Sequence, residues 1–199
     1  AMAYEAAPHI PNDPKVQRSY RALARHLREQ HDALTAAGYT FEPWHGEEEQ
    51  PYANSAEMMK DLRENKHLYY YRTEVSGYHQ GGQAGDVPHA SGDDSDVFRA
   101  VQDAIDPGAL PLDHPMARKV VVHDRDGNEQ TLVLNDCFRA VHDAIAHSEG
   151  HKFGPHGEKM AWWAHRSSLP REAHLALWNE TRAQNVWTNA GPHLRTKDS

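Results

Sequence analysis

Residues 135–150 read NDCFRAVHDAIAHSEG, and this stretch decides how the second half of the chain folds. Three apolar side chains recur in it at helical spacing, namely Phe138, Val141 and Ile145. Asn135 is suited to cap the start of this helix, over residues 136–150. The pattern therefore predicts an amphipathic helix whose buried face also carries His142.

Working outward, the sequence predicts further helices on both sides of this one. In the C-terminal half, a helix covers roughly 157–167 and another runs from Pro170 to about Trp187. Three helices are predicted in the N-terminal half. The first begins at Asp13-Pro14 and ends at Gly38, the second is capped by Ser55, and the third covers 96–105. Helices therefore dominate the expected fold.

Strand patterns are short. YTFEPW (39–44) is predicted to be extended, and the aromatic and β-branched run HLYYYRTEV (67–75) to be a strand. RKVVVHDRDGNEQTLVLND (118–136) predicts a hairpin around an Asp126-Gly127 turn. The expected fold class is α+β, mainly α, with a helical C-terminal half and a small antiparallel sheet or hairpin in the N-terminal half.

The length of 199 residues predicts a single domain over 1–199, with flexible tails at 1–12 and 194–199. Residues 76–95 are rich in Gly, Ser and Asp. They read as a mobile loop or lid, or as a disordered insertion.

Composition excludes several classes of function. The net charge of −8 argues against a protein that binds the phosphates of nucleic acid. A single Cys excludes a disulfide framework and a Cys-based zinc site. The absence of a long apolar run, and of a signal-peptide pattern at the start, predicts a cytoplasmic protein without a membrane span.

Histidine is the residue type that carries the functional argument, with 16 in the chain. His142 and His147 are five residues apart, which on an ideal α-helix is about 140° around the axis. Both can bind one metal ion only if the helix loosens before Gly150. A rival ligand set from the same segment is Asp143, His147 and His151, and a third reading makes His142 an ordinary buried core residue.

The third metal ligand is expected to be a carboxylate, and Glu180 is the first candidate because its helical neighbours are apolar. The alternative is that Glu180 forms a salt bridge with a nearby Arg. Glu158 and His165 are seven residues apart and share a helix face. They are candidates to orient the ligands, to hold a second metal, or to form an ordinary polar face.

Two other patterns are weaker. His123-Asp124 resembles the HD pair of phosphohydrolases, but it falls in the predicted hairpin rather than on a helix. The HExxH pattern of zinc proteases is absent, because position 143 is Asp and the second His comes one residue late. Cys137 lies at a helix start, which could lower its pKa.

Most of the chain, from about 14 to 193, resembles an uncharacterised family found in phage genomes and large phage-associated proteins. The blocks that carry this resemblance are SAEMMKDLRENKHLYYYRTE, NDCFRAVHDAIAH, HGEKMAWWAHR and NETRAQNVWTNAGPH. The resemblance implies no settled activity. It singles out the positions that match the motif of the family, which are His142, Asp143, His147, Glu158, His165, Glu180, Arg182, Asn185 and Asn189.

A second, local resemblance concerns the metal. His142-Asp143-x-x-x-His147 with Glu180 downstream is similar to the iron site of aromatic amino acid hydroxylases, which carry His-Glu-x-x-Gly-His and a later Glu. Here Asp143 replaces the Glu and Ala146 the Gly, and no pterin-binding segment is recognisable. The resemblance implies Fe(II) bound by two His and one carboxylate.

We therefore predict a mononuclear non-haem Fe(II) oxygenase with His142, His147 and Glu180 as metal ligands, using O2 and a small-molecule substrate. Asp143, His165 and Glu158 are assigned to the catalytic surroundings, and Arg182, Asn185 and Trp187 to substrate binding. The four Trp at 162, 163, 178 and 187 are expected to wall a water-poor pocket or to fill the core. The alternatives are a Zn hydrolase or dinuclear oxidase on the same helices, and a non-enzymatic phage-derived module.

Overall fold

The structure is a computed structural model that describes residues 10–44, 50–73, 75–76, 110–111, 113–152 and 155–186. Its longest element is helix α2 (Pro14–Ala36), which follows the predicted bounds closely. The carboxylate of Asp13 caps this helix by accepting from the backbone N–H groups of Lys15 and Val16, at 2.8 and 3.2 Å. Gly38, with φ at +96°, ends it as predicted.

The strands form three pairs. Strand β1 (Thr40–Trp44) pairs with β2 (His67–Tyr71), and β3 (Val75–Ser76) with β4 (Leu110–Pro111). Both of these pairs are parallel, whereas β5 (Lys119–His123) and β6 (Glu129–Val133) form the predicted antiparallel hairpin. The connection between β1 and β2 contains helix α3 (Ser55–Glu64), as a parallel pair requires. The side chain of Asn54, rather than the predicted Ser55, caps α3.

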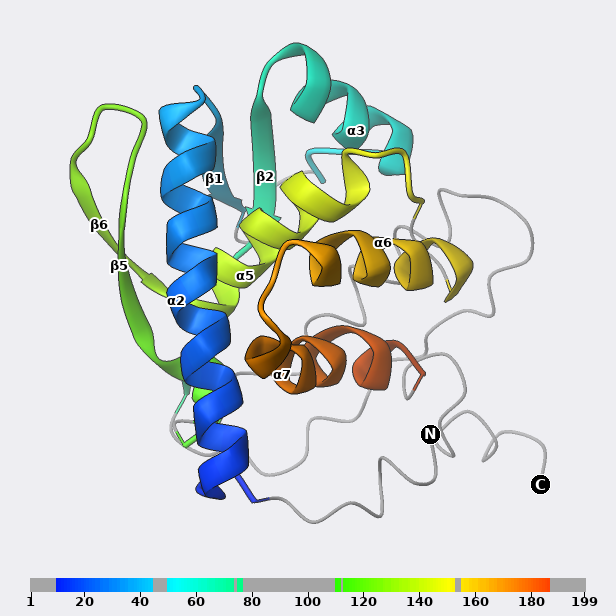
Figure 1. Ribbon diagram of the computed structural model, residues 1–199. Coiled ribbons are helices and arrows are strands. Elements are labelled where there is room, and N and C mark those ends of the chain that lie inside the picture. The colour runs from blue at the N-terminus through cyan, green and yellow to red at the C-terminus, as the bar shows by residue number, and fades with distance from the viewer. Residues whose placement is uncertain are drawn as a thin grey trace.

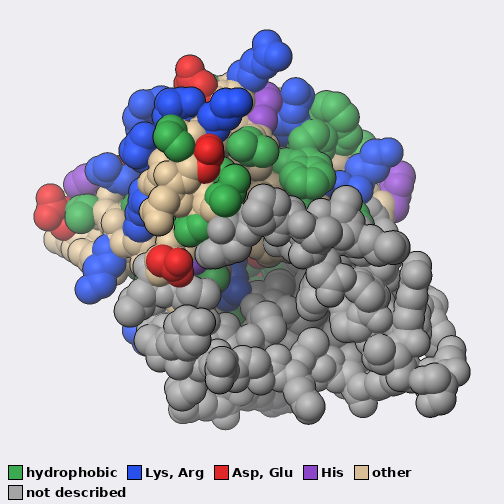
Figure 2. All heavy atoms as spheres, turned by 90° about the horizontal axis from the view of Figure 1, so that it is seen from below, with side chains coloured by type: hydrophobic (Ala, Val, Ile, Leu, Met, Phe, Trp, Pro, Cys, Tyr) green, Lys and Arg blue, Asp and Glu red, His purple; other side chains and the backbone are tan. Residues whose placement is uncertain are grey.

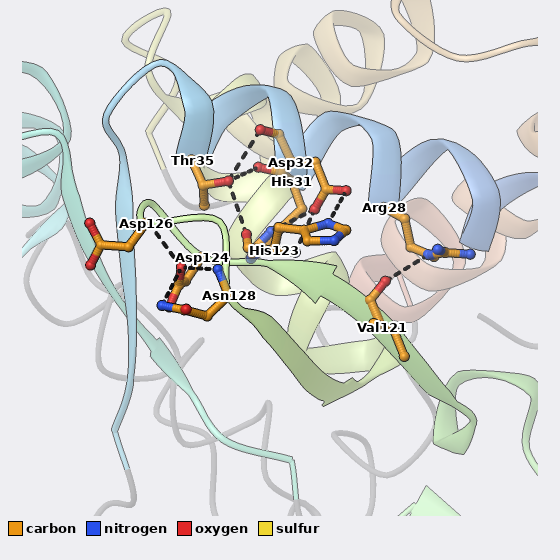
Figure 3. Close-up of polar contacts among 9 residues, drawn as sticks. All are labelled: Arg28, His31, Asp32, Thr35, Val121, His123, Asp124, Asp126 and Asn128. Atoms are coloured by element: carbon orange, nitrogen blue, oxygen red, sulfur yellow. Dashed lines mark hydrogen bonds and ion pairs between the residues drawn. The ribbon is translucent and has the colours of Figure 1, made fainter.

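Polar contacts fasten the hairpin to α2 (Figure 3). The carboxylate of Asp32 accepts from the backbone N–H of His123 at 2.7 Å and from its ring Nδ1–H at 3.0 Å. The Thr35 hydroxyl lies 3.0 Å from the carbonyl oxygen of His123, and Arg28 Nε donates to the carbonyl of Val121 at 2.8 Å. The two-stranded hairpin is therefore held by the helix as well as by its own ladder.

The C-terminal half is helical, as predicted, and its regular helices are interrupted by tighter and wider turns. Its elements in chain order are α5 (Leu134–His142), the π-helical η2 (Asp143–His147), α6 (Pro155–Ser167), the 3₁₀ turn η3 (Arg171–Ala173), α7 (His174–Trp178) and the π-helical η4 (Asn179–Ala183). A further 3₁₀ turn, η1 (Pro115–Ala117), precedes β5. The fold class is thus α+β, mainly α.

The start of α5 differs from the prediction. The helix begins at Leu134, and Asn135 is already inside it instead of capping it. The Asn135 side chain donates from Nδ2 to the Thr73 hydroxyl at 2.8 Å. The side chain that suggested a cap is therefore used in a tertiary contact.

Two hydrophobic clusters form the core of the described residues, and α2 packs against α5, α7 and β5 (Figure 1). The larger cluster unites side chains of α2, β5, α5 and α7, with Leu23, Leu27, Val122, Val141 and Leu177 fully buried or nearly so. The smaller cluster joins α3 and β2 and includes Ala144 from η2. Leu34 packs against both.

The surface is mixed in character. Figure 2 shows Lys and Arg side chains spread over several edges of the visible face, with acidic and hydrophobic side chains between them. Within the described ranges, no helix is both long and apolar enough to cross a membrane.

Some predictions fall outside the described residues. These are the helix at 96–105, the tail at 194–199, and the loop at 76–95 apart from Ser76, which belongs to β3. Of the predicted tail at 1–12, residues 10–12 are described and precede α2.

Candidate metal centre

A π-helical turn brings the two central histidines together. In a π-helix the backbone hydrogen bond spans five residues, so a side chain and the fifth one after it lie on the same face. Segment η2 covers Asp143–His147, directly after His142. The two imidazole centroids are 5.6 Å apart, with the rings almost perpendicular. The loosening of the helix that the five-residue spacing requires is confirmed, and Gly150, at φ +96°, lies just beyond it.

Helix α6 packs against η2 and supplies a carboxylate. Glu158 Oε1 lies 3.7 Å from His147 Nε2. One ligand atom from each of His142, His147 and Glu158 lies within 4.8 Å of the other two. His147 is completely buried, His142 is 5% exposed, and the Glu158 side chain is 13% exposed. The structure therefore brings together two imidazoles and a carboxylate that could hold a metal ion.

The hydrogen bond at the far side of the His147 ring sets its tautomer. Nδ1 lies 2.6 Å from the carbonyl oxygen of His151, which can only accept, so Nδ1 carries the proton. In the neutral ring, Nε2 then has a lone pair. This nitrogen lies 3.7 Å from Glu158 and 3.9 Å from Asp143 Oδ1. The ring is thus prepared to bind a cation through Nε2.

The His142 ring is held on two sides. It stacks on Phe138 with centroids 5.3 Å apart, and its Nδ1 forms a 3.0 Å hydrogen bond with Nδ1 of His165. Its other nitrogen, Nε2, is buried and has no hydrogen-bond partner among the described residues. A buried polar atom without a hydrogen bond costs about 1–3 kcal/mol, so the unsatisfied Nε2 of His142 calls for an explanation.

Burial keeps the imidazoles neutral. It lowers the pKa of His147, and it lowers the pKa of His142 well below the usual range, with His165 and His147 acting in the same direction. Burial also lowers the pKa of His165 to about 3. Each of the three rings therefore carries a single proton at neutral pH, which is the state that metal binding needs.

Burial has the opposite effect on the carboxyl groups. It raises the pKa of Glu158 to about 7, against the lowering effect of the Arg182 charge. It raises the pKa of Asp143 to about 6, against the effect of His147 and with the help of Glu158. Because both carboxyl groups have raised pKa values, a metal ion that binds here can take the place of a bound proton.

Glu180, the carboxylate predicted from the sequence as the third ligand, does not belong to this group of three. It lies in η4, and its side chain is engaged by neutral hydrogen-bond donors. The donors are the Tyr20 hydroxyl, Asn179 Nδ2 at 3.1 Å and Gln184 Nε2 at 2.8 Å. These contacts satisfy the Glu180 carboxylate with neutral donors.

Glu158 and His165 share one face of α6, as their spacing predicts, and both reach the histidines of α5 and η2. Glu158 contributes the carboxylate of the group, and His165 touches His142. Both nitrogens of His165 are in hydrogen bonds, because its Nε2 contacts Gln30 Oε1 at 3.1 Å. Both ring nitrogens of His165 are thus occupied by hydrogen bonds, and neither is left for a second metal in this arrangement. The seven-residue spacing was the signal that could have placed Glu158 at the site.

The structure describes two of the three predicted substrate-binding residues. The charge of Arg182 lowers the pKa of Glu158, so Arg182 lies near the site, and Asn185 is half-buried after η4. Trp187 lies outside the described residues. Trp163 and Trp178 are 48% and 47% exposed, so these two do not form the predicted water-poor wall.

The competing patterns have structural roles. The ring of His151 pairs with Glu149 at 3.4 Å, and His151 meets His147 through its carbonyl, so the rival ligand set is not assembled. The Asp124 carboxylate accepts the backbone N–H groups of its own turn. Cys137 is buried, and burial raises the pKa of its thiol to about 12, contrary to the lowered value considered for a helix start.

Comparisons with protein-family models, with curated proteins and with solved structures gave no match to this chain.

Proposed function

We propose that the protein is a metalloenzyme in which His142, His147 and Glu158 bind one divalent metal ion, with Fe(II) as the first candidate. The observation that carries the proposal is His142 Nε2, which is buried without a hydrogen-bond partner among the described residues, in a residue that offers a ligand atom within 4.8 Å of those of His147 and Glu158. A metal ion would satisfy this atom. Two imidazoles and one carboxylate are the ligand set of non-haem Fe(II) oxygenases.

Three protein ligands leave coordination positions open for O2 and for a small-molecule substrate. The protein would then be an oxidoreductase. The chain contributes the orientation of the ligands, through the hydrogen bonds of His165 and His151, and the exclusion of water around the buried rings. The positive charge of Arg182 suits a substrate that carries a carboxylate or another anionic group.

A zinc-dependent hydrolase is the second candidate, and Asp143 is the residue that favours it. Its carboxyl oxygen lies 3.9 Å from His147 Nε2, and burial raises its pKa to about 6. A carboxyl group that titrates near neutral pH beside a metal is suited to take a proton from a metal-activated water. In the HExxH pattern an acidic residue also follows the first His, and the one additional residue here is accommodated by the π-helical turn.

Metal analysis of variants tests the ligand set. Protein purified without oxygen is reconstituted with Fe(II) or with Zn²⁺ and its metal content measured, beside His142→Ala, Glu158→Gln and the matched variant Glu180→Gln. We expect about one metal ion per chain in the wild type and in Glu180→Gln, and less than about a tenth of that in the other two. Loss in Glu180→Gln with retention in Glu158→Gln would restore the ligand set predicted from the sequence.

The identity of the metal separates the two candidate functions. Preferential retention of iron with substrate-dependent O2 uptake supports the oxygenase. Retention of zinc with hydrolysis and without O2 uptake supports the hydrolase. A wild type that binds neither metal contradicts both proposals and leaves a structural module.

A further inference from the structure

Four hydrogen bonds connect Ser168, Gln30, His165 and His142. Ser168 follows α6, and its hydroxyl donates to the carbonyl oxygen of His165 at 2.8 Å. Because a hydroxyl has only one proton, Ser168 Oγ must accept its second contact, which comes from Gln30 Nε2 at 2.9 Å. The orientation of the Gln30 amide is therefore determined: its nitrogen faces Ser168 and its oxygen faces His165.

This orientation determines the proton positions on two imidazoles. Gln30 Oε1 lies 3.1 Å from His165 Nε2 and can only accept, so His165 carries its proton on Nε2. His165 Nδ1 then has a lone pair and accepts from His142 Nδ1 across 3.0 Å. With its proton on Nδ1, the His142 ring presents a lone pair on Nε2, the atom that has no hydrogen-bond partner among the described residues.

We propose that Gln30 and Ser168 are positioning residues that hold His142, through His165, in the tautomer able to bind a metal ion. Neither residue belongs to the group of His142, His147 and Glu158, and Gln30 comes from a different part of the chain. The effect on metal affinity rests on the proposed function. The tautomer itself does not, because the hydrogen bonds that set it are present in the protein without metal.

The alternative tautomer is chemically simple. If His165 Nε2 loses its acceptor, the proton of His165 can move to Nδ1 and donate to His142 Nδ1. His142 must then carry its own proton on Nε2, which blocks that nitrogen as a ligand. One proton shift at the Gln30 end of the chain therefore changes the ligand atom at the other end.

The chain offers matched variants. Gln30→Met keeps the length of the side chain and removes both the acceptor and the donor, whereas Gln30→Glu keeps an acceptor for His165 Nε2–H. Ser168→Ala removes the group that orients the amide. Ser167→Ala is its control, because the Ser167 hydroxyl donates to the carbonyl of Ala164 and is outside the chain of hydrogen bonds.

The first measurement is the tautomer of each His in the full chain without metal, by long-range ¹H–¹⁵N NMR. We expect His142 protonated on Nδ1 in the wild type, Gln30→Glu and Ser167→Ala. We expect a substantial fraction protonated on Nε2 in Gln30→Met, and a smaller fraction in Ser168→Ala. A wild type protonated on Nε2, or a Gln30→Met spectrum with His142 unchanged, would overturn the proposal.

The second measurement is the affinity for Zn²⁺, by competition with a chelator. We expect the Kd to rise about 10- to 100-fold in Gln30→Met, and to stay within about twofold of the wild type in Gln30→Glu and Ser167→Ala. Equal affinities in the wild type and Gln30→Met would overturn the role of Gln30 and leave the metal site standing. A wild type that binds no metal would end the proposed function, and the NMR result would still decide the tautomer.

Discussion

At the scale of single residues, Glu158 is predicted to reduce the stability of the metal-free protein as the pH rises. Burial raises the pKa of its carboxyl from 4.5 to about 7. A group whose pKa is higher in the folded state contributes stability that is present below pH 4.5 and is lost as the pH rises through 7. With about 1.4 kcal/mol per pKa unit, this contribution is on the order of 3 kcal/mol.

The substitution Glu158→Gln should remove the contribution of this carboxyl group to the pH dependence of stability. We expect the metal-free variant to be more stable than the wild type at pH 8 and about equal to it near pH 4.5, measured by urea denaturation across this range. The total slope also contains Asp143, whose raised pKa acts in the same sense, and the buried histidines, whose lowered pKa values make stability rise with pH up to about 6.5, so the prediction concerns the difference between variant and wild type. Glu149→Gln, a change on the surface, should leave the wild-type slope intact; a Glu158→Gln variant that behaves in the same way would contradict the prediction.

At the scale of elements, the attachment of the β5–β6 hairpin to α2 depends on Asp32 (Figure 3). Its carboxylate accepts from both the backbone and the ring of His123, and an amide can replace only part of this. We expect Asp32→Asn to lower the free energy of unfolding by about 1–2 kcal/mol. Chemical denaturation measures the loss, and hydrogen exchange should show faster exchange in the hairpin than elsewhere.

Asp126→Asn is the matched control, because it is the same substitution at the tip of the same hairpin. Its carboxylate is exposed and points away from the contacts between hairpin and helix (Figure 3). We expect a change within about 0.5 kcal/mol. Equal effects of the two substitutions would show that Asp32 does not hold the hairpin.

Elements with local signals could be predicted from the sequence. Helix α2 was predicted by its apolar spacing and its Asp13 and Gly38 ends, and the hairpin by its Asp126-Gly127 turn. The parallel pairing of β1 with β2 was not predicted. The two strands are separated by a helix, and the sequence of a single strand does not indicate whether it pairs in parallel or antiparallel. Two predicted caps were wrong: Asn54 instead of Ser55 caps α3, and Asn135 lies inside α5 with its side chain in a tertiary contact.

The same division applies to the group of His142, His147 and Glu158. The two histidines and the required loosening of the helix follow from a local spacing, and both were predicted. The carboxylate depends on which helix packs against η2, and this is a property of the tertiary structure. Glu158 and Glu180 both lie on faces that the sequence marks as plausible. Only the packing of α6 on η2 selects Glu158 for the group.

At the scale of the whole molecule, the group of His142, His147 and Glu158 lies where the two hydrophobic clusters meet. Val141, directly before His142, belongs to the larger cluster, and Ala144, between the two histidines, belongs to the smaller one. Glu158 adds α6 to the same junction. A ligand bound at a junction stabilises every part that must separate before it is released, so metal binding should stabilise both clusters together.

Native-state hydrogen exchange can test this coupling. The amides of Leu23 in α2 and Leu62 in α3 lie in different clusters and exchange only when the surrounding helix opens. With Zn²⁺ at about a hundred times its Kd, we expect the free energy of exchange to rise by about 2.7 kcal/mol at both amides. In His142→Ala neither should change. A rise at Leu23 without one at Leu62 would show that the clusters unfold separately and that the centre stabilises only the larger one.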